Sequence, residues 1–456
     1  MAGISDVLEV AKRALIAQRL GLDITSNNIA NASTPGFSRQ RVDFAETPAV
    51  RTKYGLIGTG VTASHIGRVR ERFIDQQVRA ASDTFGYATT QQRILSQVEA
   101  AVNEPSDNGI ASAISRFFNA FQDLSVHPEE SSARNSVLQQ GTLLAQGFHR
   151  LNTNMKQLRG DLANDVESKL RDINQLAKDI SELDTKITNA MAEGLDPSAL
   201  KDQRDINIDA LAKLVKVNVS EDTSGSVMLS VGGTVIASRA GAVTLSSAIV
   251  GNQIKIYAGN STQETTILSG ELGGVLEAYN TALPDFLSKL DQAAKALIDS
   301  VNALHVAGFS LENPPSTGNN FFTGTSAENI GIDPAVANDT DKIAASLDGK
   351  PGNNEMALAI ANVRNEALLN GNTTSIPQFY NTFVSTVGTA INATDNTMRN
   401  QELILTQLEN QRTAVSGVSI DEEMTNLIKY QRSFDAAAKV VVAVNDLFTT
   451  LLQMVQ

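Results

Sequence analysis

Apolar residues recur at helical spacing at both ends of the 456-residue chain. Their steps of three and four residues form a heptad pattern, which is typical of long helices that pack against another helix. The pattern predicts a first helix that ends by about Ala32 and a last helix from about Ser419 to Met454, paired with each other. The N-terminal series is Ile4, Leu8, Ala11, Leu15, Gln18, Leu22, Thr25 and Ile29, and the C-terminal series is Met424, Leu427, Gln431, Phe434, Ala438, Val441, Asn445, Phe448, Leu452 and Val455.

The stretch SNNIANASTPGFSRQ, residues 26–40, ends the first helix. Pro35 disfavours a helical conformation at Thr34, and Gly36 permits a backbone conformation that other residues avoid. Before the last helix, Gly417 marks a break, and the acidic residues 421–423 follow in its first turn. We interpret these acids as a response to the partial positive charge at a helix start.

Between the two ends, the periodicity predicts further helices and one group of strands. The expected helices cover 87–103, 110–124, 131–158, 157–192, 200–214, 279–305 and 378–413. The segments VKVNV, VMLSV, TVIAS and IKIYA, between 215 and 258, are rich in β-branched residues, and Gly232-Gly233 indicates a hairpin. Turn-forming residues dominate 39–65 and 308–355, which are expected to be irregular.

The predicted fold is mainly α with an inserted small β domain, in an elongated, nested multidomain architecture. Its long terminal helices form a coiled coil. We expect residues 1–75 with 417–456 to form a terminal helical domain, and residues 76–215 with 270–416 a long-helix domain with an irregular excursion at 308–375. The β domain covers 216–269. A chain of this length normally exceeds one hydrophobic core.

Charge and composition exclude several classes of function. The net charge of −13 argues against nucleic acid, because binding to phosphates needs clustered Lys and Arg. The chain has no cysteine, which excludes disulfides and thiolate metal sites. The N-terminal residues lack the pattern of a cleavable signal peptide, and no continuous apolar stretch of about 18 residues is present, so no membrane insertion is expected.

The sequence contains no pattern that predicts a catalytic, metal or cofactor site. The four histidines are far apart and lack partners at metal-ligand spacing, and no phosphate-binding loop or nucleophile elbow occurs. The run KDQRD at 201–205 clusters two acids and two bases. A solvated helix face with salt bridges three and four residues apart explains it better than a catalytic site does.

Several blocks carry a resemblance to a known family. The segment ALIAQRLGLDITSNNIANASTPGFSRQ, 14–40, resembles the N-terminal signature of bacterial flagellar axial (rod, hook and hook-associated) proteins. The blocks at 200–217, 270–311, 320–324 and 416–455 occur in the order expected of the hook-associated protein 1 family. The β segment and residues 325–375 are weakly matched.

The resemblance implies a structural, non-catalytic subunit that forms the hook–filament junction layer at the distal end of the hook. It also implies export by the flagellar type III apparatus, and therefore an extracellular location in the flagellum. The implied partners are further copies of the chain in a helical or ring-like layer, the hook protein, a second junction protein (hook-associated protein 3), and an export chaperone at the C-terminal helix.

On this interpretation the terminal helices pack with those of neighbouring subunits, and polar seam residues restrict the register. Two alternatives remain. One is another axial component, a hook or rod protein; the other is a cell-wall hydrolase, although residues 216–269 hold only three acids and no histidine. The predicted assembly interface consists of Leu8, Leu15, Leu22, Asn28, Ile29, Asn31, Met424, Leu427, Gln431, Phe434, Val441, Asn445, Phe448 and Leu452.

Overall fold

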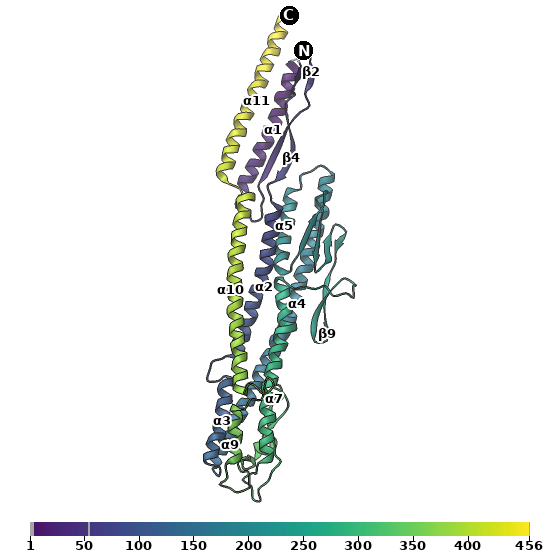
Figure 1. Cartoon of the computed structure of the whole chain (residues 1–456). Helices are drawn as coiled ribbons and strands as arrows, with labels where there is room; N and C mark the ends of the chain where they lie inside the picture. Colours follow the sequence, from purple (N-terminus) through teal and green to yellow (C-terminus); the bar gives the residue numbers. More distant parts are fainter. Residues whose placement is uncertain (1–3, 53–54, 456) are drawn as a thin grey trace. The chain divides into compact units, whose positions relative to one another are not determined.

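The computed structural model describes residues 4–52 and 55–455, which are mainly helical with small antiparallel sheets (Figure 1). By internal contacts the chain divides into two compact units. Unit 1 comprises residues 1–84, 172–245 and 401–456, and unit 2 comprises residues 85–171 and 246–400. Three of the four unit boundaries fall inside long helices: α2 (Arg72–Val102), α4 (Ser131–Ala192) and α10 (Ile376–Ser416). The three-domain division expected from the sequence stays a prediction.

Unit 1 contains the paired terminal helices. Helix α1 (Ile4–Ala30) lies side by side with α11 (Ile420–Val455), as the heptad pattern predicts (Figure 1). Strands β1 (Gln40–Glu46) and β4 (Val61–Arg68) form a two-stranded antiparallel sheet that contacts α1, and β2 (Val50–Thr52) pairs with β3 (Gly55–Ile57). The expectation of an irregular segment over 39–65 is therefore wrong. Only Val42 among the apolar residues of these strands is buried, so no alternation marks the two hairpins in the sequence.

The rest of unit 1 packs helices against a small sheet. The C-terminal part of α4 lies with α5 (Ser198–Leu214) and a four-stranded antiparallel sheet in the order β5-β6-β7-β8. Its core is formed by fully buried aliphatic side chains, because apolar residues on one face of each element remove their surface from water. The strands are β5 (Asn218–Glu221), β6 (Val227–Val231), β7 (Thr234–Ser238) and β8 (Gly241–Ala242), and the core side chains include Ile180, Ile187, Ile208, Leu211, Leu229 and Ile236.

Unit 2 is a helical body with short strands and loops. Its helices are parts of α2, α4 and α10 together with α3 (Ile110–Val126), α6 (Gly270–Glu277), α7 (Leu283–Ala307), α8 (Pro334–Asn338) and α9 (Glu355–Asn362). A five-residue π-helix, Ala278–Ala282, joins α6 to α7, and short 3-10 turns lie at Thr340–Lys342 and Val363–Asn365. Nearly all of β9 (Leu245–Val250) belongs to this unit, as do β10 (Gln253–Ala258), β11 (Phe322–Thr323) and β12 (Gly331–Ile332).

The helices expected from the sequence are all present, with different limits. The two expected over 131–158 and 157–192 are one continuous helix of 62 residues, α4. The helix expected from Tyr87 begins at Arg72. In both places polar residues interrupt the apolar pattern without breaking the backbone, because Asn, Ser and Gln are tolerated in helices that packing stabilises.

Two buried polar side chains hold the irregular segment 308–355 onto the helices of unit 2. On α7, His305 donates from Nδ1 to the carbonyl of Asn319 at 2.7 Å, and its Nε2 accepts from the backbone N–H of Ala344 at 3.0 Å. On α4, Arg134 donates to the carbonyls of Pro128 at 2.7 Å and Ile343 at 2.6 Å. Both anchors satisfy loop backbone groups that would otherwise be buried without partners.

We expect His305 to make unit 2 acid-sensitive. Burial lowers the pKa of His305 from 6.5 to about 4, so the unfolded chain binds a proton at a higher pH than the folded chain does. The contribution of His305 to the free energy of unfolding is fully present above pH 6.5 and is lost as the pH falls toward 4. Between pH 7 and pH 4.5, the free energy of unfolding should fall by about 2 to 3 kcal/mol. Urea unfolding followed by circular dichroism at the two pH values measures this loss.

The variant His305→Gln should lose this part of the pH dependence, whereas His127→Gln, at an exposed position, should keep it. Equal pH dependence in the wild type and His305→Gln would show that the His305 contacts do not control the acid response.

Candidate assembly interface

One face of α11 packs against α1. Tyr430 lies against Gly21, where a Cβ atom would stand 3.1 Å from the tyrosine ring, so the absence of a side chain at Gly21 makes room for the ring. Phe44 of β1 meets the same ring edge-on, with centroids 6.1 Å apart. A series of buried and half-buried residues of α11 alternates by four and three, as a coiled-coil seam requires. The seam residues are Glu423, Leu427, Tyr430, Phe434, Ala437, Val441 and Val444, and the half-buried residues Asn426, Ser433 and Ala438 lie beside them.

The predicted interface residues are placed in three ways. On α1, Leu15, Leu22 and Ile29 are half-buried and Asn28 is buried, and Asn31, directly after the helix, is half-buried. Three predicted residues of α11 belong to its seam: Leu427, Phe434 and Val441. The remaining predicted residues are exposed in the single chain and are free to contact another molecule; they are Leu8, Met424, Gln431, Asn445, Phe448 and Leu452.

A second apolar stripe on α11 is uncovered, and it was not predicted from the sequence. Leu447 is 55% exposed, Leu451 47% and Met454 77%. The stripe lies one residue before Ala437, Val441 and Val444 of the α1-facing seam, and is therefore rotated by about 100° from that seam. We call this set the uncovered stripe; it consists of Ala436, Val440, Ala443, Leu447, Leu451 and Met454.

The exposed apolar character of this region is also evident from its hydropathy. Within 376–454, an 18-residue window of helix is apolar enough by length and composition to cross a membrane, and 6% of that window is buried. The prediction from the sequence excluded only an unbroken apolar run of about 18 residues, and this window is not such a run. Up to two charged residues are allowed in such a window. Core helices of soluble proteins meet the same criterion, but they are mostly buried.

The first turn of α11 is tied to α1 and β1 by a buried cluster of polar side chains. Asn28 donates from Nδ2 to the carbonyl of Gln40 at 2.9 Å and to Glu423 Oε2 at 3.1 Å, while its Oδ1 accepts from the Gln40 N–H at 2.9 Å. Arg39 Nε pairs with Glu423 Oε1 at 2.8 Å. Asn28 and Glu423 are 1% and 2% exposed. We call Asn28, Arg39, Gln40 and Glu423 the terminal clasp. Within one chain, the clasp explains why a polar residue, Asn28, is buried near the end of the first helix.

The clasp corrects the interpretation of the acids at the start of α11. Glu423 is a buried partner of Asn28 and Arg39, and helix-start electrostatics alone does not account for it. Glu422 is exposed and pairs with Arg39 at 2.6 Å. The sequence could not show this, because the partners lie almost 400 residues apart along the chain.

The Thr-Pro-Gly turn leads from the clasp to α5. Asn31 donates to Asn27 Oδ1 at 2.7 Å and accepts from the Thr34 hydroxyl at 3.2 Å. Gly36 has a φ of +78° and lies against Ile206, so any side chain there would be strained and would clash. Two residues later, the backbone N–H and hydroxyl of Ser38 donate to the Asp202 carboxylate at 3.1 and 2.7 Å.

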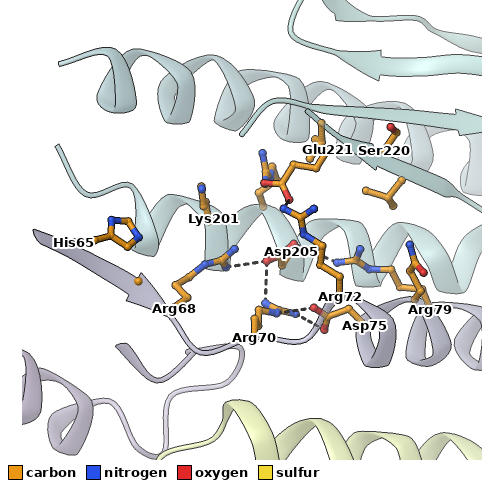
Figure 2. Close-up of a pocket in the computed structure, with 15 residues that line it drawn as sticks. His65, Arg68, Arg70, Arg72, Asp75, Arg79, Lys201, Asp205, Ser220 and Glu221 are labelled. Carbon is orange, nitrogen blue, oxygen red and sulfur yellow. Dashed lines mark hydrogen bonds and ion pairs between the residues drawn. The ribbon is translucent and has the colours of Figure 1, made fainter. Parts of the chain in front are cut away.

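A network of carboxylates and arginines lies around α5 (Figure 2). Asp205 accepts from Arg68 at 2.8 Å, from Arg70 at 2.9 Å and from Arg79 at 3.2 Å. Burial disfavours the charge of Asp205, but Arg70, Arg68 and Arg79 outweigh burial and hold its pKa below the ordinary value. Asp209 bridges Arg79 and Arg412, at 2.7 and 2.6 Å.

The interpretation of KDQRD as a solvated helix face is therefore wrong. Asp202, Arg204 and Asp205 are buried and pair with residues far along the chain, Arg204 with Asp184 at 2.7 Å. Local spacing could not reveal partners on other elements. Arginines neutralise the carboxylates of Asp202 and Asp205, which makes both of them poor candidates for a general base. In residues 4–52 and 55–455, no group of three or more ligand-type side chains is placed to hold a metal ion.

Comparisons with known proteins match the parts of the chain that form these contacts. The family model for the flagellar hook-associated protein FlgK helical domain matches residues 95–322. The models for the flagellar basal body rod FlgEFG protein C-terminal region and the flagella basal body rod protein match residues 409–454 and 8–37. The last two matches coincide with α11 and with α1 and its turn.

Full-length relatives and a solved structure are also similar. Flagellar hook-associated protein 1 of Bacillus subtilis (strain 168) is 31% identical, over 98% of this chain and 97% of its own length. The protein of the same name from Salmonella typhimurium is 25% identical, over 99% of this chain and 100% of its own. The flagellar hook junction protein FlgK from Burkholderia pseudomallei shares the fold, with a TM-score of 0.65 at 15% identity over 75% of this chain and 100% of that chain.

Removing the Asn28 side chain should destabilise unit 1. Asn28→Ala leaves the N–H and C=O of Gln40 buried without partners, which should cost about 2 to 4 kcal/mol of unfolding free energy. Asn27→Ala, one residue earlier and exposed, should cost well under half as much. Urea unfolding of both variants measures the difference, and equal costs would contradict the importance of the clasp.

Neutralising Asp205 should be similarly costly. Asp205→Asn keeps the shape of the side chain but leaves Arg68, Arg70 and Arg79 without their shared anion, which should reduce the unfolding free energy by about 3 kcal/mol. The exposed residue Asp172 provides the control, since Asp172→Asn changes the net charge equally. A loss no larger than that of the control would mean that the network contributes little to stability.

Proposed function

The chain belongs to the flagellar hook-associated protein 1 family, and from this premise we propose that it forms a layer of the hook–filament junction at the distal end of the hook. Members of the family are structural, non-enzymatic components of the extracellular flagellum. The proposed layer assembles from copies of the chain that contact one another through their terminal helices.

The observation that carries this proposal is the uncovered stripe of α11. Six apolar residues spaced by three and four along one helix face are exposed in the single chain. Contiguous exposed apolar surface of this kind is characteristic of protein interaction sites. A heptad-like stripe favours another helix as its partner, because knobs-into-holes packing requires side chains at matching spacing. Since α1 already covers the adjacent face, the stripe is available to a helix from a neighbouring copy.

Exposed residues around the same helices support a wider contact. Phe448 and Leu452 are exposed at the C-terminal part of α11, and Met424 is exposed near its start. Gln431 and Asn445 are also exposed. We propose that these two amides pair with polar groups of neighbouring copies, because polar residues in a helical seam restrict the register at some cost in stability.

The remaining partners follow from the family. We propose that the layer contacts the hook protein on one side and hook-associated protein 3 on the other. Before assembly, an export chaperone would bind α11, whose uncovered stripe would otherwise favour aggregation. Passage through the flagellar type III apparatus is proposed on the same basis, and the absence of cysteine from the chain is compatible with it.

Deletion of the gene tests the junction role. Electron microscopy of the deletion strain should show hooks without filaments, and flagellin should accumulate in the medium. A strain complemented with the wild-type gene controls for effects on neighbouring genes. Normal filaments in the deletion strain would contradict the proposal.

A substitution in the uncovered stripe tests the assembly surface. Leu451→Asp places a charge in an apolar contact and should prevent incorporation into flagella. The variant should unfold like the wild type, because Leu451 is already about half exposed, at 47%.

The matched control is Gln453→Asp, which adds a negative charge at an exposed position of the same helix about 200° away, outside the residues proposed as contacts. Incorporation is measured in sheared flagella with an antibody, and stability by thermal unfolding of the monomer. Normal incorporation of Leu451→Asp would show that the stripe is not the contact surface.

A further inference from the structure

Two adjoining pockets of unit 1 share a wall of basic side chains. One has a volume of about 520 Å³ and the other about 450 Å³, and both are lined by His65, Gly67, Arg68 and Lys201. His65 and Arg68 come from β4, and Lys201 from the first turns of α5 (Figure 2). The larger pocket is also lined by Arg72 and Arg204.

Several hydrogen-bond donors at this wall have no acceptor. Among the described residues Lys201 has no ion-pair partner, and its Nζ lies 3.4 Å from the position that a Cβ atom on Gly225 would occupy. Arg68 reaches both of its carboxylates, Asp202 and Asp205, through Nη1 alone, which leaves Nη2 and Nε available. The Nε of Arg204 is buried and has no partner in the described part of the chain.

The acids around the larger pocket are already paired with arginines. Asp184 accepts from Arg204 at 2.7 Å, and Glu221 lies between Arg204 at 3.4 Å and Arg72 at 2.9 Å. Burial lowers the pKa of Lys201, Glu221 opposes this change, and the like charges of Arg68 and Arg204 add to the lowering. Burial and the neighbouring arginines therefore disfavour the charged form of Lys201, and a bound anion would stabilise that form.

We propose that Lys201, Arg68 and Arg204 form a binding site for an oxyanion, a carboxylate or phosphate group that enters through the pocket beside β4. Guanidinium and ammonium groups form short, charge-assisted hydrogen bonds to such oxygens, and Lys201, Arg68 and Arg204 all line the larger pocket. The exposed side chains of Arg72 and His65 lie at the same pocket and give the anion a basic approach. This site is independent of the proposed junction role, because it is complete within unit 1 of a single chain.

Thermal unfolding of the monomer with millimolar phosphate, against sodium chloride at equal ionic strength, tests the site. Phosphate should raise the unfolding temperature of the wild type by roughly 2 to 4 °C at about ten times its dissociation constant. Lys201→Gln should abolish this rise, and Lys201→Arg, which keeps the charge, should retain it. Phosphate also stabilises proteins in general by exclusion from their surface, so only the difference between wild type and Lys201→Gln counts.

The matched control is Lys216→Gln, at an exposed position shortly after α5, which should respond to phosphate like the wild type. An equal rise in the wild type and Lys201→Gln would overturn the proposal. If Lys201→Gln does not fold, calorimetric titration of the wild type with phosphate decides: saturable binding of one phosphate per chain supports the site, and no binding overturns it.

A second measurement identifies the source of the oxyanion. If a neighbouring copy supplies a carboxylate, saturating phosphate should compete with self-association of the purified chain in sedimentation, and Lys201→Gln should weaken that association. If the oxyanion comes from the medium, phosphate should leave self-association unchanged or strengthen it. Because the phosphate test uses the monomer, its result stands whether or not the junction role is confirmed.

Discussion

The buried amide of Asn28 is the interaction on which the arrangement of the chain ends depends. It satisfies both backbone groups of Gln40 and one oxygen of Glu423, and so joins α1, β1 and α11 at one point. A buried polar group without partners costs more than a hydrogen bond contributes, so the three elements are stable only when they meet there together. With the clasp closed, Tyr430 packs on Gly21, α11 lies along α1, and its uncovered stripe remains exposed for another molecule.

Charge pairing continues this constraint into the rest of unit 1. Directly after the Thr-Pro-Gly turn, Ser38 donates to Asp202, which also pairs with Arg68. Asp205 pairs with three arginines. Such a network is costly to break because each partner is partly desolvated. Where carboxylates face the arginines, the guanidinium donors have acceptors and the network stabilises the fold. Beside Lys201, donors of Arg68 and Arg204 lack acceptors, so this region is suited to an external oxyanion.

Elements could be predicted from the sequence wherever one local rule decides the structure. Heptad spacing identified α1 and α11, Pro35 and Gly36 identified the end of α1, and β-branched runs identified β6 and β7. The hairpins at 40–68 were not predicted, because their strands bury only one apolar residue, Val42. Apolar and polar positions therefore do not alternate along them in the sequence. The clasp and the Asp205 network were missed because their partners are distant in sequence. Val441 and Leu427 could be assigned to a seam from their spacing. The neighbouring uncovered stripe could be recognised only from the structure, in which α1 covers one face of α11 and leaves the next face exposed.

The central claim is that the uncovered stripe of α11 becomes buried between copies of the chain in the flagellum. Because the chain has no cysteine, Leu447→Cys would be its only thiol, and a maleimide probe would report the accessibility of that position. Burial between copies predicts rapid labelling of the purified monomer and strong protection in intact flagella, with Lys186→Cys, at an exposed position of α4, labelled in both. Equally rapid labelling of Leu447→Cys in monomer and flagella would contradict the claim.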